Sequence, residues 1–143
     1  VDGVHVGQSD VPVSTCRKML GPDAVIGLSM PTTQMIPYVH HADLSEIDYL
    51  GIGPLHPTQT KPDCGRLANG TIHTRSLHDV EELVASTDVP AVVGGGVKVA
   101  DIPALAQTGI AGYFVVSAVC AAPRPYDAAR ELVDAWRSCR TTS

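Results

Sequence analysis

Several features are scarce in this sequence, and each scarcity excludes a class of function. There are 10 Lys and Arg residues against 15 Asp and Glu, giving a formal net charge of −5, and the basic residues form no cluster. Because nucleic-acid binding requires a basic face to neutralise phosphates, we expect no nucleic-acid partner. No apolar run approaches the roughly 18 residues that a membrane span requires. The N-terminal residues 1–3 also lack the basic region of a signal peptide, so we expect a cytoplasmic location.

Cysteine is present but not in a pattern that binds metal or forms a disulfide framework. Cys16, Cys64, Cys120 and Cys139 lie far apart, with no CxxC or CxxH spacing. The sequence therefore predicts four reduced thiols. With 44% hydrophobic and 17% charged residues, the chain has enough apolar side chains for a core, and we expect residues 1–143 to form one domain or part of one.

Short apolar runs of strand length recur along the chain, each followed by turn residues and then a helical pattern. The predicted strands are 3–7, 25–29, 48–53, 90–94 and 112–117. The predicted helices are 12–20, 32–43 (interrupted by Pro37), 76–87, 99–108 and 125–139. Apolar strands that alternate with helices indicate a parallel sheet with helical crossovers, so the fold class is α/β.

In such folds, ligands bind at the C-terminal ends of the strands. Three connections there carry more glycine and polar residues than a turn requires: 7–10, 53–63 and 94–96. The connection after the third strand is an extended loop of about 20 residues, a length typical of loops that serve a site.

Two of these connections can bind anions. Gly94, Gly95 and Gly96 end a strand and precede a helix, so their amides can approach a phosphate, although a tight turn with positive φ would also select glycine. Val116 and Ser117 end the neighbouring strand, and we expect them to lie beside the triplet.

The loop 53–63 carries Thr58, Thr60 and Lys61. Two hydroxyls at alternate positions can face one ligand if the backbone is extended, and the lysine suits a second anion. A solvated polar loop is the alternative.

The remaining candidates are single residues. Asp10 follows the first strand and could hold Mg²⁺ together with substrate phosphates, or cap the helix that begins near Pro12. Ser29 ends the second strand and is a ligand candidate by position. None of the histidines has a convincing nucleophile partner in the sequence, so we expect no hydrolytic triad.

Taken together, six segments resemble thiamine phosphate synthase. They are GVHVGQSD at 3–10, IGLS at 26–29, DYLGIGP at 48–54, PTQTK at 57–61, GGV at 95–97 and VSA at 116–118. They follow the order of that family at nearly its spacing, over almost the whole chain. The family is a TIM (β/α)₈ barrel that couples hydroxymethylpyrimidine diphosphate to thiazole phosphate, releasing pyrophosphate and forming thiamine phosphate.

The resemblance implies roles for individual residues. It implies that Asp10 ligates Mg²⁺, and that Ser29 and Lys61 contact the pyrimidine diphosphate as the catalytic residues. It implies that the thiazole phosphate is held by Thr58, Gln59, Thr60, Gly96, Val116 and Ser117. The implied mechanism is dissociative, so that Mg²⁺ and Lys61 stabilise the departing pyrophosphate and no general base is needed.

Two features depart from the family pattern. His56 stands where the family has an apolar or aromatic residue, and the segment 64–76 is more polar than the corresponding loop. The family also uses residues of its first three strands, among them a second Mg²⁺ ligand, which this sequence does not contain.

An eight-unit barrel takes about 250 residues. We therefore expect the chain to hold about the last five βα units of such an enzyme, with only small-molecule substrates as partners and a possible fusion to another thiamine pathway domain. The alternatives are a thiazole tautomerase-like isomerase on the same barrel and a non-catalytic fragment that binds a phosphate ligand.

Overall fold

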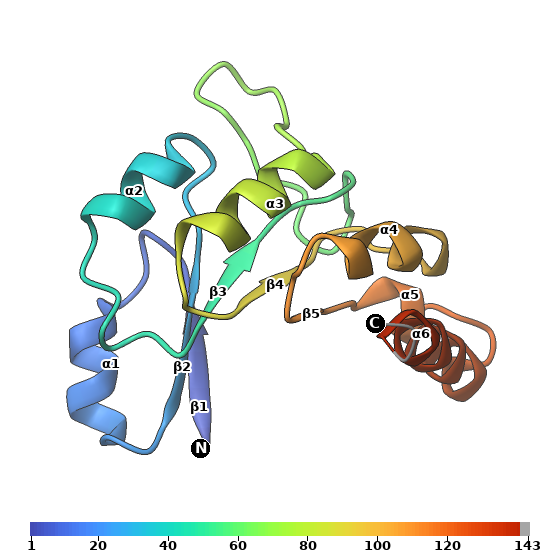
Figure 1. The fold of residues 1–143 in the computed structure, drawn as a ribbon, viewed down its shortest axis with the longest axis horizontal. Helices are drawn as coiled ribbons and strands as arrows, with labels where there is room; N and C mark the ends of the chain where they lie inside the picture. The colour runs from blue at the N-terminus through green and yellow to red at the C-terminus, as the bar shows by residue number, and fades with distance from the viewer. Residues whose placement is uncertain (141–143) are drawn as a thin grey trace.

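The computed structural model describes residues 1–140, and Figure 1 shows their arrangement. Its strands are β1 (Gly3–Val6), β2 (Val25–Ser29), β3 (Tyr49–Ile52), β4 (Ala91–Val93) and β5 (Gly112–Tyr113). Its helices are α1 (Val13–Leu20), α2 (Met35–His41), α3 (Leu77–Ser86), the 3₁₀ turn η1 (Val99–Asp101), α4 (Ile102–Gln107), α5 (Ser117–Cys120) and α6 (Pro125–Arg140). The expected domain runs to residue 143, and residues 141–143 lie outside the described part.

The strands form one parallel sheet in the order β1-β2-β3-β4-β5. Neighbouring strands pair in register, with Leu28 opposite Leu50 and Ile52 opposite Val93. This confirms the α/β class and the parallel sheet. Over residues 1–140 the sheet is open, with β1 and β5 at its edges, and the closed eight-stranded barrel stays a prediction.

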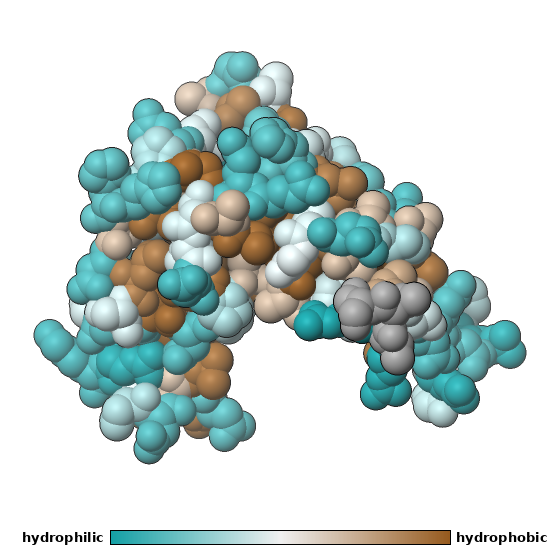
Figure 2. All heavy atoms as spheres, viewed as in Figure 1, coloured by the Kyte–Doolittle hydropathy of each residue, from teal (hydrophilic) through white to brown (hydrophobic). Residues whose placement is uncertain are grey.

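The long helices cover the convex side of the curved sheet, and the concave side is hollow (Figures 1 and 2). Residues that alternate along the strands pack under the helices, where Ile26, Leu50 and Val93 are fully buried. Leu83 of α3 and Leu105 of α4 complete the same buried cluster. The apolar strands are thus explained by their helix-facing side chains.

The concave face carries glycines where the helix-facing positions carry aliphatic residues. An added Cβ at Gly27 would overlap the Tyr49 ring, and one at Gly51 would lie 2.8 Å from the His5 ring. The rings of His5 and Tyr49 therefore fit across the strands only because their neighbours have no side chain.

Three local predictions need correction. The predicted helix 32–43 begins only at Met35, because Gln34 takes a left-handed conformation with φ of 56°. Pro37 then falls in the first turn, where no intrahelical hydrogen bond is lost, so it does not interrupt the helix. The strand predicted over 112–117 pairs only at Gly112 and Tyr113, and Ser117 instead begins the short helix α5.

The long connection between β3 and α3 matches its prediction. It carries an isolated antiparallel bridge between Arg66 and Ile72. The buried Arg75 ties it to the loop before α2, by donating from one terminal nitrogen to the carbonyls of Pro31 (2.6 Å) and Thr32 (2.9 Å). The polar segment 64–76, which had no explanation from sequence, is in part this anchoring structure.

No helix among residues 1–140 has the length and apolar character needed to cross a membrane. The four cysteines are all free thiols, as predicted.

Candidate functional site

A cavity of about 530 Å³ lies at the C-terminal ends of the strands. Most of the residues singled out in the sequence line it, although they come from the end of β2 and from the segments that follow β1, β3, β4 and β5. These are Asp10, Ser29, Thr58, Thr60, Lys61, Gly94, Gly95, Gly96, Val116 and Ser117. Gln59 is exposed and does not line the cavity, although the threonines on either side of it do.

The glycine triplet forms one wall of the cavity, and its conformation requires glycine. Gly95 and Gly96 have φ of 80° and 73°. An added Cβ at Gly96 would also lie 2.8 Å from the carbonyl oxygen of His56. The triplet is therefore a tight turn, as one of the two interpretations from sequence expected, and it also lines the cavity. Its binding of a phosphate stays a prediction.

Unpaired amides converge on this wall. The N–H groups of Gly95, Gly96 and Val97 have no acceptor among the described residues, and the same holds for Ser117 and Ala118 on the neighbouring connection. Backbone amides that lack a protein acceptor and are grouped at strand ends beside positive-φ glycines are able to donate hydrogen bonds to an anion.

Asp10 lies at the cavity rim and does not cap a helix. Its Oδ2 accepts a hydrogen bond from the Gly7 amide at 2.7 Å, whereas the N-cap of α1 is Pro12, with no side-chain cap. The N-cap alternative was therefore wrong. The second carboxylate oxygen of Asp10 has no hydrogen-bond partner in the described part of the chain.

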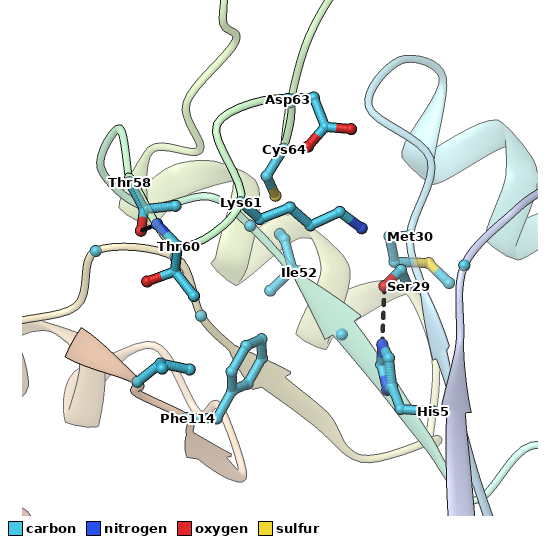
Figure 3. Close-up of a pocket in the computed structure, with 18 of the residues that line it drawn as sticks. His5, Ser29, Met30, Ile52, Thr58, Thr60, Lys61, Asp63, Cys64 and Phe114 are labelled. Carbon is cyan, nitrogen blue, oxygen red and sulfur yellow. Dashed lines mark hydrogen bonds between the residues drawn. The ribbon is translucent and has the colours of Figure 1, made fainter. Parts of the chain in front are cut away.

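Ser29 belongs to a hydrogen-bonded chain across the concave face (Figure 3). His5 Nε2 lies 2.8 Å from Ser29 Oγ, and His5 Nδ1 lies 2.9 Å from the Tyr49 hydroxyl. Gln8 also donates to the Ser29 carbonyl at 2.8 Å. The sequence offered no histidine a convincing nucleophile partner, yet His5 contacts the Ser29 hydroxyl, because residues distant in sequence become neighbours when parallel strands pair. The other ring nitrogen of His5 meets Tyr49 and not a carboxylate, so this contact does not contradict the expectation that there is no hydrolytic triad.

The electrostatics of the cavity favour the neutral form of His5. Burial lowers the pKa of His5, and the charge of Lys61 lowers it further, with Asp10 opposing weakly. A neutral imidazole has one donor and one acceptor nitrogen, so His5 can hydrogen-bond to the hydroxyls of Ser29 and Tyr49 at the same time without adding a charge.

The loop after β3 brings Lys61 over the cavity. Thr58 Oγ1 accepts from the Thr60 amide at 3.2 Å, so this stretch is a local turn and not the extended backbone that we expected. Thr58 and Thr60 still both reach the cavity. The Lys61 side chain points toward Ser29 at the end of β2, away from Phe114 (Figure 3).

His56 connects this loop to the glycine wall. Its Nε2 lies 2.9 and 3.0 Å from the two carboxylate oxygens of Asp101, whose Oδ2 also accepts from the Lys98 amide at 2.8 Å. The His56 amide donates to the Gly95 carbonyl at 2.9 Å. The residue that departed from the family pattern is thus a tie between two cavity-forming loops.

Sequence reasoning missed several cavity residues. His5, Met30, Asp63, Cys64 and Phe114 all line the cavity. Phe114 could have been found by alternation, because it shares the concave face with Val116, two residues later. Cys64 could not, since no local pattern marks it; burial raises the pKa of its thiol, although the charge of Lys61 opposes the rise.

The fit of Mg²⁺ rests on Asp10. Residues 1–140 bring no three His, Cys, Asp or Glu side chains together as a metal cluster. Mg²⁺ commonly takes one or two carboxylates, with substrate phosphates and water as the remaining ligands. Asp10 has one carboxylate oxygen without a partner among residues 1–140, at the rim of the cavity, which suits Mg²⁺ that takes its other ligands from substrate and water. It does not suit a metal ion coordinated by protein side chains alone.

A parallel α/β fold whose glycine-rich and polar connections meet in one cavity at the C-terminal strand ends defines the class of protein: an α/β protein with its candidate ligand site at the strand ends. A family model described as thiamine monophosphate synthase matches residues 1–119. The chain belongs to this family.

Curated relatives carry the same description. The thiamine-phosphate synthase of Corynebacterium efficiens is 41% identical over 134 residues, which are 93% of this chain and 58% of that protein. The enzyme of Laribacter hongkongensis is 40% identical over 131 residues, covering 92% of this chain and 57% of the relative. The chain therefore spans less than two thirds of the length of these relatives.

Solved structures agree. Thiamine phosphate pyrophosphorylase from Pyrococcus furiosus superposes with a TM-score of 0.74 at 25% identity, over 96% of this chain and 60% of that one. The 3-hexulose-6-phosphate synthase of Salmonella typhimurium has a TM-score of 0.69 at 19% identity, which is a likeness of fold alone.

Proposed function

We propose that this chain carries the thiazole phosphate site and part of the pyrimidine diphosphate site of a thiamine phosphate synthase, a transferase of thiamine biosynthesis. The observation that supports it most is one cavity with anion-binding groups at two ends. Unpaired amides at Gly95, Gly96, Val97 and Ser117 form one end, and Lys61 forms the other.

In this proposal, the phosphate monoester of the thiazole substrate accepts hydrogen bonds from those amides and from the Ser117 hydroxyl. Thr58, Gln59 and Thr60 bind the same substrate from the opposite loop, Gln59 through its main chain, and Gly96 and Val116 form the wall. These contacts hold the thiazole nitrogen in line with the pyrimidine methylene, which lowers the entropic part of the barrier.

The diphosphate lies between Asp10, Ser29 and Lys61. The Lys61 ammonium group neutralises the charge that develops as pyrophosphate leaves, and the Ser29 hydroxyl, held by His5, donates to or accepts from the substrate. Asp10 would hold Mg²⁺, which supplies charge stabilisation to the leaving diphosphate when bound.

The partners in this proposal are small molecules, with a cytoplasmic location and a possible fusion to another thiamine pathway domain. Nucleic acid and membrane have no part in it.

The direct test is pyrophosphate release from the two phosphorylated substrates with Mg²⁺. We expect Lys61→Ala to lower turnover by about 100-fold, the size of effect that follows loss of a group stabilising transition-state charge. Lys18→Ala, on the exposed surface of α1, is the matched control and should leave turnover unchanged. Equal turnover in the Lys61 variant would contradict the assigned role.

A phosphate-binding chain without transferase activity is the second candidate, favoured by the unpaired amides alone. Calorimetry separates the two: the transferase binds both substrates, whereas a phosphate binder takes only the monoester. Thiazole tautomer conversion without coupling would instead indicate the related isomerase.

A further inference from the structure

Phe114 exposes an aromatic ring inside the cavity. Its exposed fraction is 48%, and that of Val116, the next residue on the same face, is 49%. Tyr113, before them, points the other way, since its hydroxyl donates to the Leu132 carbonyl. Val115, between them, borders the cavity but is partly buried against the core. Two large apolar side chains therefore stand in the cavity without being part of the core.

The Phe114 ring is seated on Gly94. An added Cβ at Gly94 would overlap three carbons of that ring. Gly95 and Gly96 need glycine for their positive φ, whereas Gly94 has no such φ. Glycine is therefore needed at position 94 to leave room for the Phe114 ring, and not to allow a particular backbone conformation.

The seat is rigid. The Gly94 amide donates to the Ile52 carbonyl at 3.0 Å, and the Phe114 amide donates to the Val93 carbonyl at 2.9 Å. These two bonds continue the sheet ladder on both sides of the ring, so the ring position is set by main-chain pairing rather than by a mobile loop.

The ring lies between the two polar ends of the cavity. The Phe114 ring contacts Gly94, which directly precedes Gly95 and Gly96 in the chain. Figure 3 shows the ring below Thr60, on the side of the cavity away from Ser29. A ligand whose phosphate occupies the amides must place its next atoms against Phe114 and Val116. An aromatic ring buried against an aromatic ring gains dispersion and stacking energy there.

We propose that Phe114, seated on Gly94, contacts the substrate and forms the platform on which the heteroaromatic ring of the phosphate monoester substrate stacks. This inference rests on the proposed function, and it assigns the ring-recognition residue within that site. Phosphate recognition belongs to the amides, and ring recognition belongs to Phe114.

The test is calorimetric binding of two probes to the chain: 4-methyl-5-(2-phosphoethyl)thiazole, and inorganic phosphate. We expect Phe114→Ala to weaken binding of the thiazole phosphate by at least about tenfold, and binding of inorganic phosphate by less than about twofold. Phe114→Tyr keeps the ring and should bind both probes nearly as the wild type does. Val25→Ala removes a side chain of equal exposure (49%) outside the cavity and should change neither affinity.

A second variant tests the seat. Gly94→Ala displaces the ring and should also weaken thiazole phosphate binding, while the double variant Gly94→Ala with Phe114→Ala should bind no more weakly than Phe114→Ala alone. Circular dichroism of each variant confirms that it is folded.

Each outcome decides the matter. If the wild type binds the thiazole phosphate and Phe114→Ala binds it equally well, or loses both probes in parallel, the platform is overturned and the proposed function stands. If the folded wild type binds inorganic phosphate but not the thiazole phosphate, both are overturned. Independent, additive losses in the double variant would overturn the seat.

Discussion

At the scale of single residues, the concave face is made by pairs of a ring and a glycine. His5 lies over Gly51 and Gly27, and Phe114 lies over Gly94. Each glycine removes a side chain so that a ring from a neighbouring strand can lie flat across the sheet. A methyl group at any of these glycines would displace a ring that lines the cavity, so the shape of this face depends on residues that carry no side chain.

His5 makes stability depend on pH. Burial holds the pKa of His5 below its usual value of 6.5, so at mildly acidic pH the unfolded state binds more protons than the folded state. Stability then falls as the pH drops below about 6.5. We expect urea unfolding of the wild type to weaken from pH 7.5 to pH 5.5, and His5→Gln to show a smaller decrease.

Tyr49→Phe is the control for this effect. It removes the hydrogen bond to His5 Nδ1 but keeps the neighbouring ring that helps to shield the imidazole from water, and this desolvation is the largest cause of the lowered pKa. The pH dependence should therefore persist in that variant. An unchanged slope in His5→Gln would assign the dependence to another group.

At the scale of elements, α3 begins with a capping box that positions the end of the long loop. Ser76 Oγ accepts from the Asp79 amide at 3.1 Å, and Asp79 Oδ2 accepts from the Ser76 amide at 2.6 Å. Ser76→Ala should lower the free energy of unfolding by about 1 kcal/mol. Ser14→Ala, on the exposed surface of α1, should change it by less than about 0.5 kcal/mol in the same denaturant titration.

The His56–Asp101 pair links two further elements, the loop after β3 and the turn η1. Its side chains are 43% and 22% exposed, so solvent screening limits the coupling to about 0.5–1 kcal/mol. A double-mutant cycle with His56→Ala and Asp101→Ala, measured by urea unfolding, should return a coupling energy of that size. Additive effects would show that the two loops are held by their main-chain bonds alone.

At the scale of the whole molecule, a single buried cluster joins β1, β2, β3 and β4 to the helices on the convex side, and Tyr113 of β5 packs against it. Leu83, fully buried at the centre of α3, should therefore be sensitive. Leu83→Ala is expected to lower the free energy of unfolding by about 2–5 kcal/mol, with a matching loss in Tm. Leu77→Ala, at the 39% exposed start of the same helix, is the control, and a loss as large there would contradict the single core.

Much of the architecture could be predicted from local patterns. The apolar runs at Val25–Ser29 and Tyr49–Ile52 become paired strands, and the amphipathic stretch at the C-terminus becomes α6. Boundaries failed where tertiary contacts outweigh local preference. Val116 and Ser117 continue an apolar run, yet β5 pairs with β4 only at Gly112 and Tyr113, and the chain turns into α5 instead.

Only part of the candidate site could be predicted from the sequence. Glycine at 95 and 96 and the threonines at 58 and 60 could be placed near strand ends, because the topology of parallel sheets sends those ends to one side. The Ser29–His5–Tyr49 chain could not, because its members are joined only by strand pairing. The roles of Asp10, Lys61 and the other site residues stay predictions until the assays above are done.

The sequence by itself determined the α/β class, the parallel sheet, the free thiols and the family, because each depends on periodicity or on motifs a few residues long. The tertiary structure decided which polar groups meet: His5 with Ser29, His56 with Asp101, and Phe114 with Gly94. Those contacts depend on register between strands and on the path of a long loop. Both are set by the summed packing of the whole core, which no short stretch of sequence encodes.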